Sequence, residues 1–163
     1  MRTPKTDPAR AFLLSVREAR TERKQLERRL SQLRSEAERI TAAYGDRQPG
    51  GSGDPHRDAL LAEIADRSAG LDGAVRKCWR VEELADDFIH ELGDYRHRAI
   101  LRLRYIDCLR WPKLTEALTE LGLWYEERQV FRLHGVALQE ARRIWPEWVK
   151  RHPELQEVEA WEN

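Results

Sequence analysis

The feature that most constrains the fold is a row of apolar residues that recurs at alternating spacings of four and three. Its ten positions are Phe12, Val16, Ala19, Arg23, Leu26, Leu30, Leu33, Ala37, Ile40 and Tyr44. Such spacing puts the side chains on one face of an α-helix and is typical of a coiled-coil seam, in which a polar residue such as Arg23 often sets register or partner choice. Asp7-Pro8 supplies an N-cap and a first-turn proline, so we predict a helix over residues 8–44.

A second long helix is predicted over residues 55–92. A Gly- and Pro-rich segment, residues 45–53, ends the first helix, and Asp54-Pro55 repeats the starting signal. The second seam is weaker, because polar residues and glycines interrupt it; its positions are Leu61, Ile64, Ser68, Leu71, Val75, Cys78, Glu82, Ala85, Ile89 and Leu92. Two helices of similar length with a short connection favour an antiparallel hairpin over residues 7–93. Since a lone hairpin buries little surface, we expect part of the seam to pack on a second copy, giving a homodimer, or on the C-terminal region.

Three shorter helices are predicted over residues 94–150. Asp94 is a candidate N-cap for a helix that reaches Tyr105, and Trp111-Pro112 begins a helix that ends at Gly122. A third helix is expected from near Glu126 to about Trp145. Three short helices with a turn before the third are typical of a helix-turn-helix domain. Residues 151–163 are expected to form an acidic tail, which contains Glu154, Glu157, Glu159 and Glu162.

The third helix divides into an apolar and a polar face when residues are placed at 100° intervals. The apolar face holds Val130, Leu133, His134, Ala137, Ala141, Ile144 and Trp148. The opposite side holds Arg128, Gln129, Arg132, Gly135, Gln139, Arg142 and Arg143. A DNA-recognition helix needs this division, because Arg pairs with guanine and Gln with adenine in the major groove. An Arg-rich face is also common on a merely solvated helix, so the pattern alone leaves both interpretations open.

The remaining large side chains of this region are expected to be packed. We expect His134 to be a buried, hydrogen-bonded residue and not a ligand or a general base. Four tryptophans are expected to fill the core of a small domain: Trp111, Trp124, Trp145 and Trp148.

Composition narrows the function classes. Lys and Arg number 29 and so do Asp and Glu, which argues against a protein that coats nucleic acid without selection. The charge is arranged in blocks, with residues 1–56 and 94–152 net basic and residues 57–93 and 153–163 net acidic. Cys78 and Cys108 lack partners at metal-ligand spacing, and no phosphate-binding loop is visible. We therefore expect no enzyme activity, metal or cofactor. No apolar run suits a membrane span or a signal peptide, so we expect a soluble, cytoplasmic protein without membrane contact.

Two stretches of the C-terminal region resemble a known family. RAILRLRYIDCLRWPKLTEAL and YEERQVFRLHGVALQEARRI resemble region four of bacterial sigma factors, a helix-turn-helix that reads a promoter element. The whole chain, roughly residues 8–150, more closely resembles small sigma-like proteins of phages and prophages, which pair a helical hairpin with this C-terminal signature. The resemblance implies base-reading roles for Arg128, Gln129 and Arg132, and a DNA-backbone contact for Lys113. The chain departs from the family at Glu126-Glu127, where a Ser or Thr cap and a basic residue are usual.

The sequence therefore predicts an all-α chain in which a long antiparallel hairpin precedes a sigma region-four-like helix-turn-helix. The predicted function is a dimeric, phage-type transcription regulator that binds double-stranded DNA in a bacterial host, with bacterial RNA polymerase as a further candidate partner. Its candidate DNA-binding residues are Lys113, Arg128, Gln129, Arg132, Gly135, Gln139 and Arg142. Two alternatives stay open: the small DNA-recognition subunit of a phage packaging terminase, and a sigma-like module that binds polymerase or another phage protein.

Overall fold

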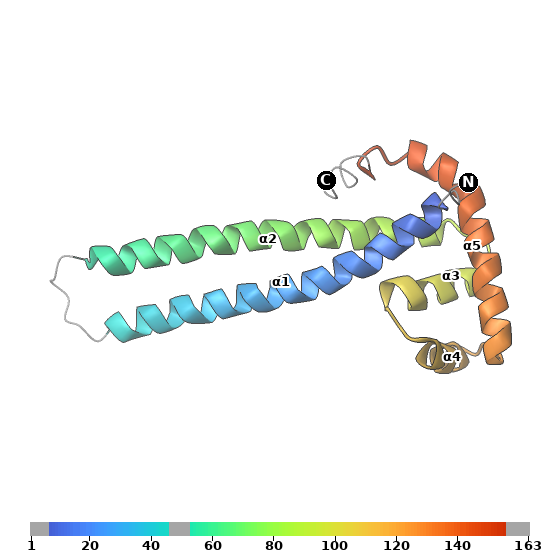
Figure 1. The fold of residues 1–163 in the computed structure, drawn as a ribbon, viewed down its shortest axis with the longest axis horizontal. Coiled ribbons are helices and arrows are strands. Elements are labelled where there is room, and N and C mark those ends of the chain that lie inside the picture. Colours follow the sequence, from blue (N-terminus) through green and yellow to red (C-terminus); the bar gives the residue numbers. More distant parts are fainter. Residues whose placement is uncertain (1–6, 46–52, 156–163) are drawn as a thin grey trace, which may run out of the picture. The chain divides into compact units, whose positions relative to one another are not determined.

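The computed structural model describes residues 7–45 and 53–155, and within them the chain is all-helical. Helices account for 85% of these residues and none lies in a strand, which confirms the all-α part of the predicted fold class. The elements are α1 (Pro8–Gly45), α2 (Pro55–His90), α3 (Tyr95–Leu101), the π-helical segment η1 (Arg102–Ile106), α4 (Trp111–Glu120) and α5 (Glu127–Lys150). The two long helices and the three shorter ones thus occur in the predicted order (Figure 1).

Three aspartates start helices as the sequence predicts. The side chains of Asp7, Asp54 and Asp94 each accept a hydrogen bond from the backbone N–H two residues ahead, at 3.1, 3.0 and 2.9 Å. Each bond satisfies one of the N–H groups that a helix leaves without an intrahelical partner. The C-terminal signal after α4 is also confirmed, because Gly122 adopts a φ of 80°, which favours glycine.

Three predicted helix ends need correction. The helix expected to reach Tyr105 is α-helical only to Leu101 and then widens into η1, where the Asp107 N–H donates to the Arg102 carbonyl at 2.9 Å. The second long helix ends at His90 instead of residue 92. The last helix runs to Lys150, past the expected end near Trp145 and through a proline, because the side chain of Trp148 is anchored in a buried cluster.

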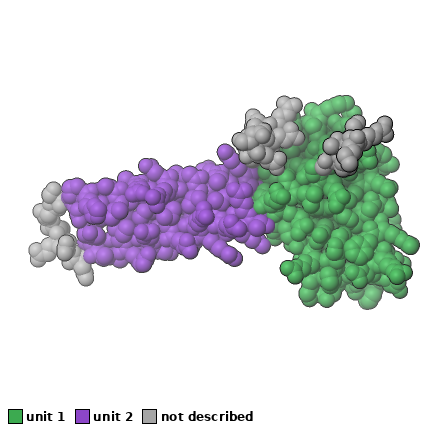
Figure 2. Space-filling view, viewed as in Figure 1, with its two compact units in different colours: residues 1–20, 80–163 green, residues 21–79 purple. Residues whose placement is uncertain are grey.

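The chain divides into two compact units, shown in different colours in Figure 2. Unit 1 takes the described residues up to Arg20 and from Arg80 onward, and unit 2 is Thr21–Trp79. Both boundaries fall inside the long helices, so each of these helices contributes to both units. The predicted domains, residues 7–93, 94–150 and 151–163, divide the chain at other points and stay predictions.

The core of unit 1 joins the ends of the long helices to the C-terminal helices. It contains a group of packed aromatic rings: the Phe88 ring lies 4.8 Å from Trp148 and 5.2 Å from Trp145, and the Phe12 ring lies 5.7 Å from Trp148. Trp148 and Phe88 are fully buried. Aromatic burial on this scale contributes strongly to the stability of a small unit. The first turns of α1 therefore belong to the core that holds α5.

In unit 2 the two long helices run side by side in opposite directions (Figure 1). Three contacts between them show the antiparallel pairing, because the residue number rises along one helix as it falls along the other. The Arg23 guanidinium lies over the Trp79 ring at 4.0 Å, Arg34 pairs with Asp72 at 3.9 Å, and the Arg57 guanidinium lies over the Tyr44 ring at 5.8 Å. Little of the seam is fully covered, and the buried side chains of unit 2 are Arg23, Leu30, Ile64, Val75 and Cys78 among the described residues.

Candidate nucleic-acid interface

The outward face of α5 is the candidate interface, and its predicted division into two faces agrees with the observed burial. Val130, Ala137, Ala141 and Trp148 are buried, and Leu133, His134 and Ile144 are half-buried. All seven residues expected on the opposite side are exposed: Arg128, Gln129, Arg132, Gly135, Gln139, Arg142 and Arg143. The 3.6-residue period thus predicts which side chains reach solvent, while their contact with DNA stays a prediction.

Four of the arginines that precede α4 are occupied by contacts within unit 1. Arg96 pairs with Asp94 at 2.5 Å and Arg102 with Asp86 at 2.5 Å. Arg98 donates to the Leu92 carbonyl at 2.5 Å, and Arg104 donates to the Leu109 carbonyl at 2.8 Å. The Arg104 guanidinium also lies over the Trp111 ring, 4.5 Å from its centroid. These four side chains support turns and helix ends, so they are poor candidates for a DNA-reading surface.

The arginines of the outward face differ from these four in their contacts. Within residues 7–45 and 53–155, the structure gives Arg128, Arg132 and Arg142 no ion pair. A guanidinium that keeps its five donors free can form a bidentate pair with a guanine or a phosphate without breaking an existing contact. Arg128 and Arg132 lie about 40° apart around α5 and about 6 Å apart along it, so both face the same side.

Gly135 lies on the same face, about one turn beyond Arg132. A Cβ added there meets no atom within 4 Å, and the residue is exposed. Packing within the described chain therefore does not require a glycine at this helical position, although glycine costs about 1 kcal/mol relative to alanine in a helix. Its effect is to lower the surface beside Arg132, which allows close approach of a ligand.

Gln129 has a local role that the sequence analysis missed. Its side-chain Oε1 accepts a hydrogen bond from the backbone N–H of Glu126 at 2.9 Å, so it closes the first turn of α5. The family resemblance indicates a base-reading role for Gln129, but reading a base with its Oε1 requires this bond to break. The pattern Glu-x-x-Gln at the start of a helix is a capping-box signal that could have revealed this role.

Lys113 is exposed at the start of α4 and already has a partner. Its ammonium group lies 2.7 Å from a carboxylate oxygen of Glu116, and this hydrogen bond, together with the attraction of the charges, raises the pKa of Lys113. Both side chains are exposed, so the pair is weak and a DNA phosphate could compete for the lysine. Lys113 therefore stays a candidate backbone contact.

A buried His–carboxylate pair fixes α5 against the start of α3. The side chain of Glu140 accepts hydrogen bonds from His97 and, at 2.8 Å, from the backbone N–H of Gly93. Burial of the Glu140 carboxylate opposes its ionisation, but the two hydrogen bonds outweigh burial and hold its pKa below the ordinary value. No spacing signal in the sequence indicates this pair, because its members lie 43 residues apart.

His134 is packed as expected. Its Nε2 lies 3.1 Å from the Tyr105 hydroxyl, and its ring centroid lies 5.0 Å from that of Trp111. Burial, reinforced by the positive charges of Arg104 and Arg10, lowers the pKa of His134 to about 4. The ring is therefore neutral near pH 7 and cannot contribute a positive charge to a nucleic-acid interface.

Several large apolar side chains of unit 1 reach solvent near the start of α5. Trp124 is 78% exposed and Leu121 is 60% exposed, both in the connection between α4 and α5. Phe131 is 45% exposed, and its ring lies 4.6 Å from that of Trp111. The expectation that the tryptophans fill the core holds for Trp148 and is wrong for Trp124.

Other candidate features lie outside this face. Within the described ranges, no group of three His, Cys, Asp or Glu side chains is placed to hold a metal ion, and no helix is both long and apolar enough to cross a membrane. Of the predicted acidic tail, Glu154 pairs with Arg80 at 3.1 Å. Glu157, Glu159 and Glu162 lie outside the described residues.

Comparison with protein-family models, curated proteins and solved structures finds no match for this chain.

Proposed function

We propose that this protein is a sequence-specific regulator of transcription that binds double-stranded DNA with the outward face of α5. In this proposal α4 and α5 are the two helices of a sigma-like helix-turn-helix, and the long helices form a hairpin that pairs two copies. The phage-type assignment, a site of action in the bacterial cytoplasm and contact with bacterial RNA polymerase belong to the same proposal. They rest on the sequence resemblance.

The observation that carries the proposal is the contrast between two sets of arginines in unit 1. Arg96, Arg98, Arg102 and Arg104 have partners within the unit, whereas Arg128, Arg132 and Arg142 form no ion pair with the described residues. Three unpaired guanidiniums on one face, with Gly135 among them, form a surface that fits phosphates and guanine edges.

The proposal assigns different roles to the outward residues. Arg128 and Arg132 read base edges in the major groove, and Lys113 holds a backbone phosphate. Arg142 lies about 120° from Val130 around the helix and serves a phosphate at the edge of the groove. Gln139 contacts the groove beside it, and Gln129 secures the first turn of α5 unless DNA displaces its bond to Glu126.

One observation favours the alternative that this surface binds a protein. Leu121 and Trp124 are exposed next to the acidic pair Glu126 and Glu127, and carboxylates oppose binding of phosphates. Exposed large apolar side chains are typical of protein interaction sites. In this case the arginines of α5 pair with acidic side chains of the partner instead of phosphates.

A binding experiment separates the two. DNA fragments bound by the purified protein are selected from a phage or prophage genome, and the recovered site is titrated with Arg128→Ala and Arg132→Ala. Loss of a base contact is expected to cost about 1–3 kcal/mol at the specific site and to relax preference at one position. Lys113→Ala is expected to weaken specific and random DNA alike and to reduce the salt dependence by about one counterion.

Lys150→Ala is the matched control, because it removes one exposed positive charge from the far end of the same helix, about 27 Å along its axis from Arg132. It is expected to bind the site as the parent protein does. The proposal fails if the parent protein selects no site, or if both arginine variants bind as Lys150→Ala does. Weakened polymerase binding by Trp124→Ala without any effect on DNA would instead favour the protein-interaction alternative.

A further inference from the structure

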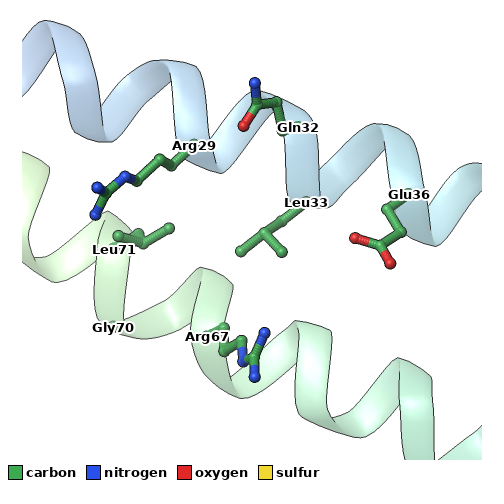
Figure 3. Close-up of a pocket in the computed structure, with 7 residues that line it drawn as sticks. All are labelled: Arg29, Gln32, Leu33, Glu36, Arg67, Gly70 and Leu71. Atoms are coloured by element: carbon green, nitrogen blue, oxygen red, sulfur yellow. The ribbon is translucent and has the colours of Figure 1, made fainter.

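Unit 2 contains an open groove between α1 and α2, of about 570 Å³. Figure 3 shows Leu33 and Leu71 pointing into it from the two helices, with Arg29 toward one end and Glu36 toward the other. Gly70 leaves space in its wall, since a Cβ added there meets no atom within 4 Å. The groove therefore has an apolar floor that the described chain leaves half-exposed.

The charged side chains of α1 at the two ends of the groove, Arg29 and Glu36, differ from the other charged side chains near it in their contacts. Arg34, Arg67 and Arg76 pair with carboxylates of α2. Arg29 and Glu36, in contrast, form no ion pair with any residue that the structure describes, and both are exposed. An opposite charge at each end of an apolar floor is the arrangement expected for a contact with a complementary surface.

The spacing of these two charges makes the surface complementary to itself. Arg29 and Glu36 are seven residues apart, so they lie two turns apart on nearly the same side of α1. If α1 of a second copy crosses antiparallel at Leu33, a two-fold axis brings Arg29 opposite the partner's Glu36 and Glu36 opposite the partner's Arg29. Both pairs form at once, as an isologous interface requires.

The size of the face also suits a second copy. Residues 21–44 of α1 span about 36 Å, and two helices side by side are about 20 Å wide, so one face of unit 2 presents about 700 Å². Stable interfaces cover about 800 Å² per partner. A second hairpin of the same length covers this face along its whole extent.

We propose that unit 2 forms a symmetric dimer in which the Leu33–Leu71 groove packs on the same groove of a second copy, with reciprocal pairs between Arg29 and the partner's Glu36. The proposal deepens, and rests on, the homodimer of the proposed function. It supplies the interface and its register.

Charge reversal tests the register directly. In Arg29→Glu homodimers the introduced carboxylate would face the partner's Glu36 in both pairs, and in Glu36→Arg homodimers two guanidiniums would face each other in both pairs. We expect each variant alone to dimerise about tenfold more weakly than the parent protein, because like charges then oppose each other. An equimolar mixture of the two variants places opposite charges across the interface again, so heterodimers are expected to form in preference to either homodimer. Sedimentation velocity and native mass spectrometry measure the affinities and the mixed species.

Arg28→Glu and Glu38→Arg are matched controls, because they make the same charge changes at exposed positions of α1 that do not line the groove. Both are expected to dimerise as the parent protein does. Recovery in the mixture also excludes misfolding as the cause of weak association by the single variants.

Three results would overturn the proposal: a parent protein that stays monomeric at about 100 times the concentration used for DNA titration, single variants that associate as the controls do, or a mixture that does not recover. These outcomes are distinct from failure of DNA binding. A dimer that forms with the expected charge dependence but selects no DNA site would overturn the regulator function and leave the interface standing.

Discussion

The two units bury the same seam pattern to different extents. Phe12 and Val16 in unit 1 are buried, whereas Leu26, Leu33 and Ile40 in unit 2, which continue the same spacing along α1, are half-buried. The helix and its period do not change between them. The neighbours differ: unit 1 packs its part of α1 against aromatic side chains of α2 and α5, and the described part of unit 2 offers only the opposite long helix. The period thus defines a face, and the packing partners decide how deeply it is buried.

The largest effect expected from this comparison is in the aromatic core of unit 1. Trp148→Ala removes a fully buried ring that touches Phe12, Phe88 and Trp145, and we expect it to destabilise unit 1 by about 3–5 kcal/mol. Thermal and urea unfolding followed by circular dichroism measure the change. Trp124→Ala is the control, because that ring is 78% exposed, and it is expected to change stability little. Equal effects of the two variants would contradict this account of the core.

A charged side chain introduced into the seam of unit 2 is expected to destabilise unit 2 and to leave unit 1 folded. Leu30 is 6% exposed, so Leu30→Asp desolvates a carboxylate in the seam and is expected to cost about 3 kcal/mol. Amide hydrogen exchange is expected to rise for residues 21–44 and 55–79 while the core of unit 1 stays protected. Leu60→Asp, at a position that is 37% exposed, is the comparison variant. Loss of protection across both units would show that they unfold together.

A fall in pH is expected to lower the stability of unit 1, because folding keeps His134 neutral. Its folded pKa of about 4 lies below the ordinary value of 6.5, so between these values the unfolded chain binds a proton that the folded chain excludes. Stability therefore falls as the pH drops from about 6.5 to about 4, by about 2 kcal/mol once solvent screening of the half-buried ring is allowed for. Urea unfolding of the parent protein and of His134→Gln over this range isolates the contribution. Parallel pH profiles of the two proteins would show that His134 is not responsible.

The smallest effects are expected at two glycines, with opposite signs. Gly122 in unit 1 has a φ of 80°, so Gly122→Ala is expected to destabilise by about 1 kcal/mol. Gly73 in unit 2 is within α2, and a Cβ added there meets no atom within 4 Å. Gly73→Ala is therefore expected to stabilise the helix by up to about 1 kcal/mol. A loss of stability in the second variant would indicate that something outside the described chain packs on Gly73.

The sequence predicts which side chains of the candidate site face solvent, but it does not predict which of them form hydrogen bonds or ion pairs within the chain. Helical arithmetic places Arg128 and Arg132 outward because the 3.6-residue period holds along an uninterrupted helix. The arithmetic cannot tell which outward side chains already have partners. Arg102 and Asp86 are 16 residues apart, and Glu140 lies 43 residues from its histidine partner, so their pairing depends on how separate helices pack.

Local signals in the sequence determined the helices of this protein: the aspartate caps, the prolines of the first turns, Gly122 and the spacing of the seams. These signals act within one or two turns, so they can be read without the rest of the chain. Only the tertiary structure decided that the first turns of α1 join the core of α5, that α5 continues to Lys150, and that unit 2 leaves its seam half-covered. Those features depend on contacts between residues far apart in the chain, where the free energy comes from burial and not from local conformation.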